Sequence, residues 1–436
     1  MQSATGRELP KHWLAIVSVI WSGQAASMFT SYAASFAAIW YVTESTGSAL
    51  ALSFLSICAY LPQGLLSPFG GVLADRINRK YLIILADFVC GVASLALGLI
   101  ILFGHVSFAA IVVMVIVRSA AQAFHYPALM ALMPMLVPDK HLLRINTLDQ
   151  LLLSVSGMAA PVLGIFLYTA LGFHSVMFLD FAGALIACAG MLLAKVPSTA
   201  HASAPSSTQS AGNATNTSAP DNITDDVTPE KRHALADIKQ GWVTLRQVRG
   251  LFVLIVLIIL GMVCFSPMSS LYPLMTYDYF QGDGYMASIA EATFAAGLLV
   301  GSTVLMTLGI GKKLTRLIAI ACISFGILCA VSGLISPSLF WLFAVLCAGM
   351  GLVSAWFSGP MMTLIQRNTS EETMGRVIGL VNTGTALAGP LGIAAGGIFA
   401  EFMGVAPFFV VDGILCAFIG ILMASFKSVR KLDSTD

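Results

Sequence analysis

The strongest constraint on this chain is a series of long apolar runs separated by short polar gaps. About 20 apolar residues suffice for a helix to cross a bilayer, and runs of that length recur along all 436 residues. Of the 22 Lys and Arg residues, all except Arg118 fall in every second gap. Because Lys and Arg are retained on the cytoplasmic side, the pattern predicts a polytopic membrane protein with both ends inside the cell.

The composition agrees with this prediction. Hydrophobic residues make up 58% of the chain and charged residues 10%, which is not the balance of a soluble domain. The basic residues are explained as topology signals, so we expect no nucleic-acid partner. The eight Cys lie in apolar runs without ligand spacing, which predicts small core residues and neither a metal nor a cofactor.

The apolar runs predict an all-α fold of twelve transmembrane helices. The first run is too long for the core of a signal peptide, so we expect it to remain as an uncleaved helix. The predicted spans are residues 12–41, 49–74, 81–103, 107–135, 142–171 and 174–196 in the first part of the chain, and 250–280, 285–310, 314–334, 338–365, 373–402 and 406–426 in the second.

The two groups of six spans repeat each other in the same orientation. FHSVMFLD ends at Asp180 and VAPFFVVD ends at Asp412, while AAPVLG around Pro161 corresponds to LAGPLG around Pro390. Parallel repeats related by an axis along the membrane normal are a transporter architecture with the substrate site between the halves. We therefore predict two six-helix bundles, residues 1–196 and 250–436.

A cytoplasmic linker, residues 197–249, is predicted between the bundles. Residues 197–228 are rich in Ser, Thr, Ala, Asn and Pro and bury too little apolar area to order themselves. From residue 229 onward, apolar residues recur at helical spacing among basic ones, which predicts an amphipathic helix on the inner leaflet.

The loop after the second span reads GVLADRINRK and resembles the signature loop of the Major Facilitator Superfamily, G-x-x-x-D-R-x-G-R-K. In such a loop Gly71 would allow close helix approach, and the charged residues would form a cytoplasmic network that stabilises one conformer. Asn78 replaces the usual Gly and tolerates left-handed backbone angles, so we expect the turn to survive. The expected network comprises Gly71, Asp75, Arg76, Arg79, Lys80 and Asp87.

Two more stretches resemble motifs of exporters in this superfamily. Gly157, Pro161 and Gly164 in the fifth span resemble the antiporter signature, which implies a tightly packed, kinked helix between the halves. Small residues also simply permit helix packing, and this alternative stays open. Arg118, followed by Gln122 in the fourth span, resembles the buried-Arg motif of proton-coupled exporters.

Nearly the whole chain resembles the Mef-type macrolide efflux proteins, a group of twelve-span drug:proton antiporters. The resemblance is carried by stretches such as WSGQAASMF from Trp21, IVRSAAQAFHYPAL from Ile116 and EETMGRVIGLV from Glu371. It implies a monomeric exporter, not an enzyme, in a bacterial cell membrane. Its expected partners are the proton, an amphipathic small molecule and membrane lipid.

Ionisable residues at membrane depth cost about 2.5–3.5 kcal/mol on insertion scales and are therefore functional candidates. The family architecture implies that Asp149 and Glu291 lie on cavity-forming helices, and we predict that Glu291 takes up the proton. Arg118 needs an anion, which we expect Asp149 or Glu291 to supply. Asp180 and Asp412, near the outer ends of peripheral spans, are interpreted as helix-start anions or as hydrogen-bond partners.

Aromatic and small polar residues on the cavity helices are the candidates for substrate contact. Aromatic rings suit bulky amphipathic compounds, and Met adapts to varied shapes. For each of them, packing in the core or against lipid is the plainer alternative. The candidates are Gln24, Phe29, Tyr32, Phe36, Phe124, Tyr272, Met275, Trp356 and Phe357.

Two other functions fit the same pattern. An importer or facilitator of another small solute would have the same fold and the same charged loop. A lipid-handling or sensory membrane protein could also use this scaffold. The chain has no Walker motif, so the expected source of energy is an ion gradient rather than ATP bound by this chain.

Overall fold

The computed structural model describes residues 12–104, 106–194, 249–308, 313–369 and 371–434, and the regular elements among them are all helical. The first part of the chain forms α1 (Trp13–Thr46), α2 (Ala49–Arg76), α3 (Arg79–Phe103), α4 (Phe108–Leu136), α5 (Asp139–Leu171) and α6 (Phe173–Leu193). The second part forms α8 (Arg249–Leu274), the π-helical turn η1 (Met275–Tyr279), α9 (Gly284–Leu308), α10 (Leu314–Leu334), α11 (Phe340–Arg367), α12 (Glu371–Met403), α13 (Val405–Ser425), α14 (Lys427–Arg430) and η2 (Lys431–Ser434).

The prediction of twelve spans is confirmed, because 12 helices within the described residues are long and apolar enough to cross a membrane. The first span was predicted to end at residue 41, whereas α1 continues to Thr46. Val42 and Thr43 are buried, and Gly47, at φ 57°, ends the helix with its N–H bonded to the Thr43 carbonyl. The predicted linker and its amphipathic helix fall mainly on residues 195–248, outside the described part.

Polar side chains cap the N-termini of several helices by accepting hydrogen bonds from free backbone N–H groups. Ser48 Oγ accepts from Ala51 N at 3.2 Å at the start of α2. Asn78 Oδ1 accepts from Lys80 N at 3.0 Å at the start of α3. The turn survives at Asn78 as expected, but it does not use a left-handed backbone: Asn78 has φ −61° and its side chain serves as a helix cap.

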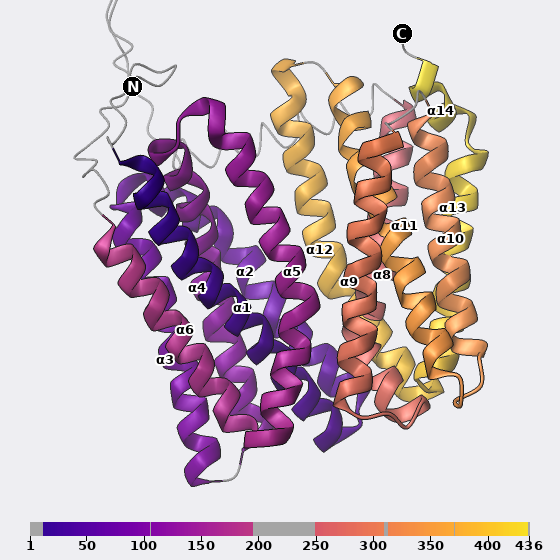
Figure 1. The fold of residues 1–436 in the computed structure, drawn as a ribbon. Helices are drawn as coiled ribbons and strands as arrows, with labels where there is room; N and C mark the ends of the chain where they lie inside the picture. The colour runs from indigo at the N-terminus through magenta and orange to yellow at the C-terminus, as the bar shows by residue number, and fades with distance from the viewer. Residues whose placement is uncertain (1–11, 105, 195–248, 309–312, 370, 435–436) are drawn as a thin grey trace, which may run out of the picture.

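The long helices form two groups, which we call the N half (α1–α6) and the C half (α8–α13) (Figure 1). The two halves use equivalent helix pairs. In the N half, α6 packs on α1 and α3, and α2 packs on α4; in the C half, α13 packs on α8 and α10, and α9 packs on α11. The halves are therefore parallel repeats in three dimensions, as the sequence predicts.

Glycines allow the equivalent helix pairs to approach closely. A Cβ atom on Gly164 of α5 would lie 2.6 Å from the Ala33 carbonyl oxygen of α1. A Cβ atom on Gly392 of α12 would collide with the Val263 carbonyl oxygen of α8. Backbone packs against backbone at both places, so a larger residue would push the helices apart.

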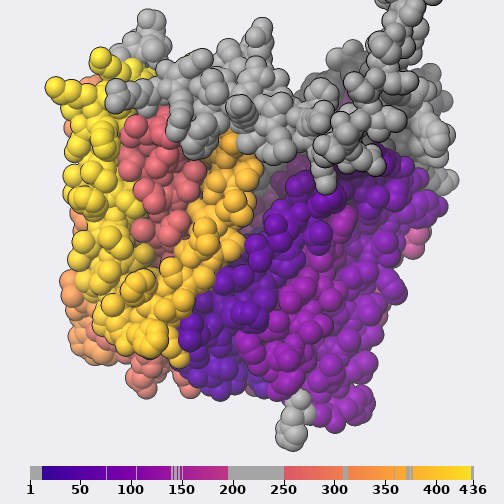
Figure 2. All heavy atoms as spheres, turned by 180° about the vertical axis from the view of Figure 1, so that it is seen from behind, coloured from indigo at the N-terminus to yellow at the C-terminus, as the bar shows by residue number. Residues whose placement is uncertain are grey.

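The beginning of α1 and the end of α13 lie at the same end of the bundle, which we call the terminal end; the opposite end is the far end (Figure 1). The halves contact each other mainly through α2 with α12 and α5 with α9. Figure 2 shows α12, in orange, lying along α2 away from the terminal end and diverging from it toward that end. The halves are thus joined at the far end.

Hydrogen bonds and aromatic rings close the far end. Glu401 of α12 accepts from Ser48 Oγ at 3.0 Å and from Leu50 N at 3.1 Å, so its carboxylate lies at the start of α2. On the other side, Thr169 of α5 bonds to the Tyr285 hydroxyl of α9 at 2.8 Å. Between them an apolar cluster spans both halves, formed by Phe36, Trp40, Ile165 and Ala287.

The close approach of α10 and α13 gives a stability prediction. A Cβ atom at Gly326 would collide with the backbone of Gly413 and Ala417, whereas a Cβ atom at Gly261 would meet nothing within 4 Å. Gly326→Ala should lower the unfolding free energy by about 1–3 kcal/mol through overpacking, and Gly261→Ala should not. Thermal unfolding of the purified variants in detergent measures this, and equal midpoints for the two variants would contradict the packing described.

Candidate functional site

An ion pair lies inside the N half between Arg118 of α4 and Asp180 of α6. The two side chains are 12% and 2% exposed. Arg118 Nη1 also donates to Ser94 Oγ of α3 at 2.7 Å, and Ser94 Oγ in turn donates to Asp180 Oδ2 at 2.5 Å. Ser31 of α1 donates to the other carboxylate oxygen at 2.8 Å. Four helices of one half therefore meet at this carboxylate.

This geometry corrects the prediction that Asp149 or Glu291 would pair with Arg118. Arg118 follows the far-end start of α4 by ten residues, or about 15 Å, whereas Asp149 precedes the far-end limit of α5 by 22 residues, or about 33 Å. Asp149 instead accepts a hydrogen bond from Trp21 Nε1 at 2.7 Å. Of the two structural roles expected for Asp180, the structure shows the hydrogen-bond partner, because Ser31 and Ser94 donate to it. It is not a helix-start anion, because it is the eighth residue of α6, beyond the first two turns.

A second polar cluster lies in the N half nearer the terminal end. Asp87 of α3 accepts from Gln24 Nε2 of α1 at 2.8 Å, and its other oxygen lies 3.3 Å from His125 Nε2 of α4. The same His125 nitrogen lies 3.1 Å from Gln24 Oε1. Asp87 was predicted to join the loop network and is instead held here by side chains of α1 and α4. Gln24, a candidate for substrate contact, is half-buried and hydrogen-bonded to Asp87.

The basic residues of the signature loop bind helix ends. Arg79 donates to the carbonyl oxygens of Ala74 at 3.1 Å and Ala131 at 2.9 Å. Lys80 Nζ donates to the carbonyl oxygens of Leu192 at 3.0 Å and Ala194 at 2.7 Å, at the C-terminal end of α6. Cations stabilise the carbonyl end of a helix, so these contacts tie α2, α4 and α6 together at the terminal end.

The other members of the expected network are placed differently. Arg76 is exposed, and the side chain of Asp75 lies outside the described part. A Cβ atom on Gly71 would meet nothing within 4 Å, whereas one on its neighbour Gly70 would collide with the Ala123 carbonyl oxygen of α4. The close helix approach predicted for Gly71 is therefore made by Gly70.

Glu291 of α9 lies half-buried where the C half faces the N half. Its electrostatic neighbours include Tyr32 of α1 and Tyr60 of α2, both in the other half. No residue of the described ranges forms a hydrogen bond or ion pair with its carboxyl group. A carboxyl group so placed is available to a proton or a cationic ligand.

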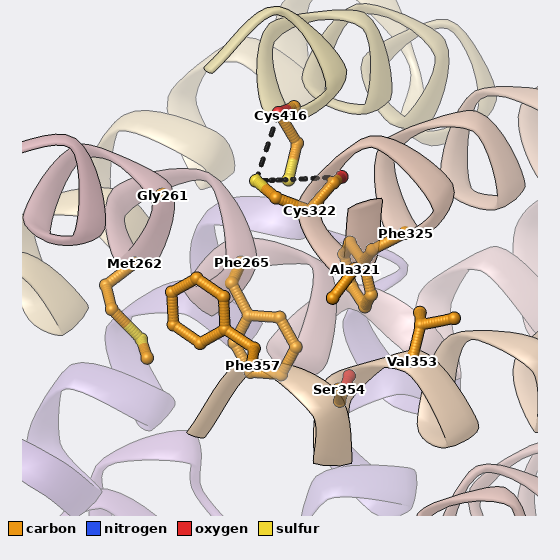
Figure 3. Close-up of a pocket in the computed structure, with 10 residues that line it drawn as sticks. All are labelled: Gly261, Met262, Phe265, Ala321, Cys322, Phe325, Val353, Ser354, Phe357 and Cys416. Carbon is orange, nitrogen blue, oxygen red and sulfur yellow. Dashed lines mark hydrogen bonds between the residues drawn. The ribbon is translucent and has the colours of Figure 1, made fainter. Parts of the chain in front are cut away.

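Three of the substrate candidates border open space. Phe29 lines an apolar groove between the halves, together with Phe166 of α5 and Tyr285 of α9. Phe357 lines a cavity of about 90 Å³ inside the C half, opposite Cys322 and Cys416 (Figure 3). Tyr32 is 38% exposed.

The remaining candidates are packed in the protein. Tyr272 and Met275 are 3% and 0% exposed, and Tyr272 lies among the rings of Phe294, Phe343 and Phe409. The core of the C half therefore holds them away from substrate in this conformation. Phe36 belongs to the far-end cluster, Phe124 packs on the core of the N half, and Trp356 donates to the Gly301 carbonyl oxygen at 3.1 Å.

The antiporter-like stretch of α5 has two faces. Gly164 faces α1 of its own half at Ala33, and Gly157 meets nothing within 4 Å of a Cβ atom. Ala159, Val162 and Leu163, on another face, line the groove opposite Tyr285 of the C half. The residues at the boundary between halves are therefore the apolar ones around Pro161 rather than the two glycines. Among the described residues, no three potential metal ligands cluster.

The buried ion pair gives a sharp test. Asp180→Asn should lower the unfolding free energy by about 3–5 kcal/mol, because Arg118 would remain buried without its counter-charge. Replacing both partners, as Arg118→Met with Asp180→Leu, should recover most of that loss. Thermal unfolding of purified protein measures both effects, with Asp283→Asn, an exposed substitution, as control. A single variant as stable as the parent, or a double variant worse than the single one, would contradict the pairing.

Comparisons with known proteins agree with this architecture. A model of the Major Facilitator Superfamily matches residues 20–392 and 284–435. Macrolide efflux protein A of Streptococcus pyogenes is 32% identical over 422 residues, which cover 97% of this chain and 98% of that protein. Macrolide efflux protein A of Enterococcus faecalis is 31% identical over 80% of this chain and 100% of that protein.

A crystal structure of a bacterial homologue of the iron transporter ferroportin, in its inward-facing state, shares the fold. Its TM-score is 0.68 at 16% identity, and the match covers 95% of this chain and 99% of that one. At this identity the likeness concerns the fold alone. The matched family model, the relatives and the twelve spans lead to one conclusion: the chain is a multi-pass membrane protein that belongs to the Major Facilitator Superfamily.

Proposed function

We propose that this chain is a secondary exporter that moves macrolide-like amphipathic compounds out of a bacterial cell in exchange for protons. The observation that carries the proposal is the similarity to macrolide efflux protein A over 97% of the chain. The unpaired carboxyl group of Glu291, which faces two tyrosines of the other half, supports proton coupling. The exporter would act as a monomer surrounded by lipid.

Alternating access would use the asymmetric contact between the halves. The far end is closed by the hydrogen bonds of Glu401 and Tyr285 and by the ring cluster around Trp40. To open this end, the N-terminal turn of α2 would have to leave the Glu401 carboxylate. Since these are a few exposed polar bonds, each contributing about 0.5–1.5 kcal/mol net, drug and proton binding could shift the balance between the two conformations.

Glu291 would couple export to the proton gradient. Macrolides such as erythromycin carry a basic amine, and a cationic amine and a proton would compete for the same carboxylate. Arrival of a proton from outside would neutralise Glu291 and release the drug. The buried pair of Arg118 and Asp180 would keep the N half rigid, so that the two halves move as bodies.

The first test is accumulation of labelled erythromycin in efflux-deficient bacteria. Cells that express the chain should accumulate less drug, and a protonophore should abolish the difference. Glu291→Gln should abolish it too, because the amide cannot bind the proton. Asp283→Asn changes an exposed acid at the start of the same helix, where it accepts from Met286 N, and should export normally. Protonophore-sensitive export by the Glu291→Gln variant would refute the role of Glu291.

The second test concerns orientation. Because the Lys and Arg residues gather on one side of the spans, the terminal end should lie in the cytoplasm. Green fluorescent protein fused to the C-terminus should then fluoresce, and alkaline phosphatase fused after Ser338, in the far-end loop between α10 and α11, should be active. The reverse pattern would invert the proposed direction of transport.

A further inference from the structure

Asp412 of α13 is the C-half counterpart of Asp180. Each is the eighth residue of a 21-residue helix. Each helix is preceded by a glycine with positive φ, Gly172 at 86° and Gly404 at 88°. The two acids therefore hold the same place in the repeated architecture.

The partners that Asp180 has in the N half are missing around Asp412. Cys329 of α10 stands at the position equivalent to Ser94 of α3. Ser94 follows Gly91 by three residues, and Cys329 follows the equivalent glycine, Gly326, by three residues. Met350 stands at the position of α11 that is equivalent to Arg118 in α4, because each is the eleventh residue of its helix. The C half therefore has the acid, Asp412, but at the position of the Arg118 guanidinium it has the thioether of Met350.

Asp412 is therefore a buried acid without a counter-charge. It is 5% exposed and forms no hydrogen bond or ion pair with any residue the structure describes. The titratable groups that face it are the thiols of Cys264 from α8, Cys329 from α10 and Cys416 from its own helix. An ionised carboxylate in such a place costs several kcal/mol, so the group carries a proton instead.

Two features connect Asp412 with the region between the halves. Cys416 follows Asp412 by one turn on the same face of α13 and lines the cavity of about 90 Å³ that extends to Phe265 of α8 (Figure 3). About 10–15 Å³ of such space can hold one water molecule. In addition, α8 contacts α1 and α2 of the N half. The cavity thus extends from the Asp412 face of α13 to a helix at the boundary.

A line of buried groups joins Asp412 to Glu291. The Tyr272 hydroxyl is buried, with the thiol of Cys347 as its side-chain neighbour. Tyr272 interacts electrostatically with Glu291 and with the thiols of Cys347 and Cys329, and Cys329 interacts with Asp412. Tyr272 and the thiols of Cys347 and Cys329 thus lie between the two acids in the core of the C half.

We propose that Asp412 is a second proton-binding site of the transport cycle: a neutral carboxylic acid in the conformation described, which releases its proton when the C half repacks around a bound drug. This inference rests on the proposed proton antiport. It assigns the C half two acids that change charge, whereas the equivalent acid of the N half stays ionised in its ion pair.

Infrared spectroscopy of the purified protein in lipid nanodiscs tests the protonation state. At neutral pH the parent should show the C=O stretch of protonated carboxyl groups, and Asp412→Asn should lose one component of this band, the rest arising from Glu291. The variant should melt like the parent, because a neutral amide replaces a neutral acid, whereas Asp180→Asn should not. Asp283→Asn should keep the band. A band unaffected by Asp412→Asn, or a variant as unstable as Asp180→Asn, would overturn the proposal.

Proton release on addition of erythromycin, followed with a pH indicator, tests the role in transport. Asp412→Asn should release about half as many protons as the parent, because one of two linked sites is removed. Release equal to that of the parent, with Glu291→Gln still deficient, would overturn this inference alone. No release from the parent, with the infrared band present, would instead overturn the proposed antiport and with it the transport role of Asp412.

Discussion

A charge buried in a membrane protein must be paired or neutralised, and the ion pair between Arg118 and Asp180 shows how this chain meets that requirement. The pair is joined by Ser94 and Ser31, so α1, α3, α4 and α6 all contribute polar side chains. Removing one partner of such a pair leaves an uncompensated charge, which costs more than the pair itself contributes. The packing of the N half is therefore fixed by electrostatics as well as by apolar contact.

Among the residues that the structure describes, the helices of the C half pack without a buried cation. Its helices approach through glycines, as at Gly326 and Gly413, and through stacked rings around Tyr272. Glu291 and Asp412 remain without counter-charges among the described residues. Two halves of one architecture thus differ in electrostatic character: the N half pairs its buried acid Asp180 with Arg118, and the C half holds acids without a counter-charge among the described residues.

The sequence predicted the spans and several site residues, and its errors have a common origin. Asp149 and Glu291 were preferred as partners of Arg118 because they lie on helices expected to form the cavity. That criterion gives the position of a helix around the bundle but not the depth of a residue in the membrane. Counting from the far end places Arg118 at about 15 Å, Asp180 and Glu291 both at about 10 Å, and Asp149 at about 33 Å. Depth alone would therefore have excluded Asp149, whereas only the packing of the N half separates Asp180 from Glu291. Gln24 and Asp87 were likewise separated into two roles, although they lie on neighbouring helices and bond to each other at 2.8 Å.

The sequence by itself determined the number of spans, their repeat and their predicted orientation, because run length and charge placement act locally and need no knowledge of neighbours. Only the tertiary structure decided which acid pairs with Arg118, which glycine of the Gly70–Gly71 pair packs against α4, and which aromatic candidates border open space. These three features depend on how each helix is rotated about its own axis. Because the helices are apolar on all faces, that rotation is set by small residues and by a few hydrogen bonds between helices.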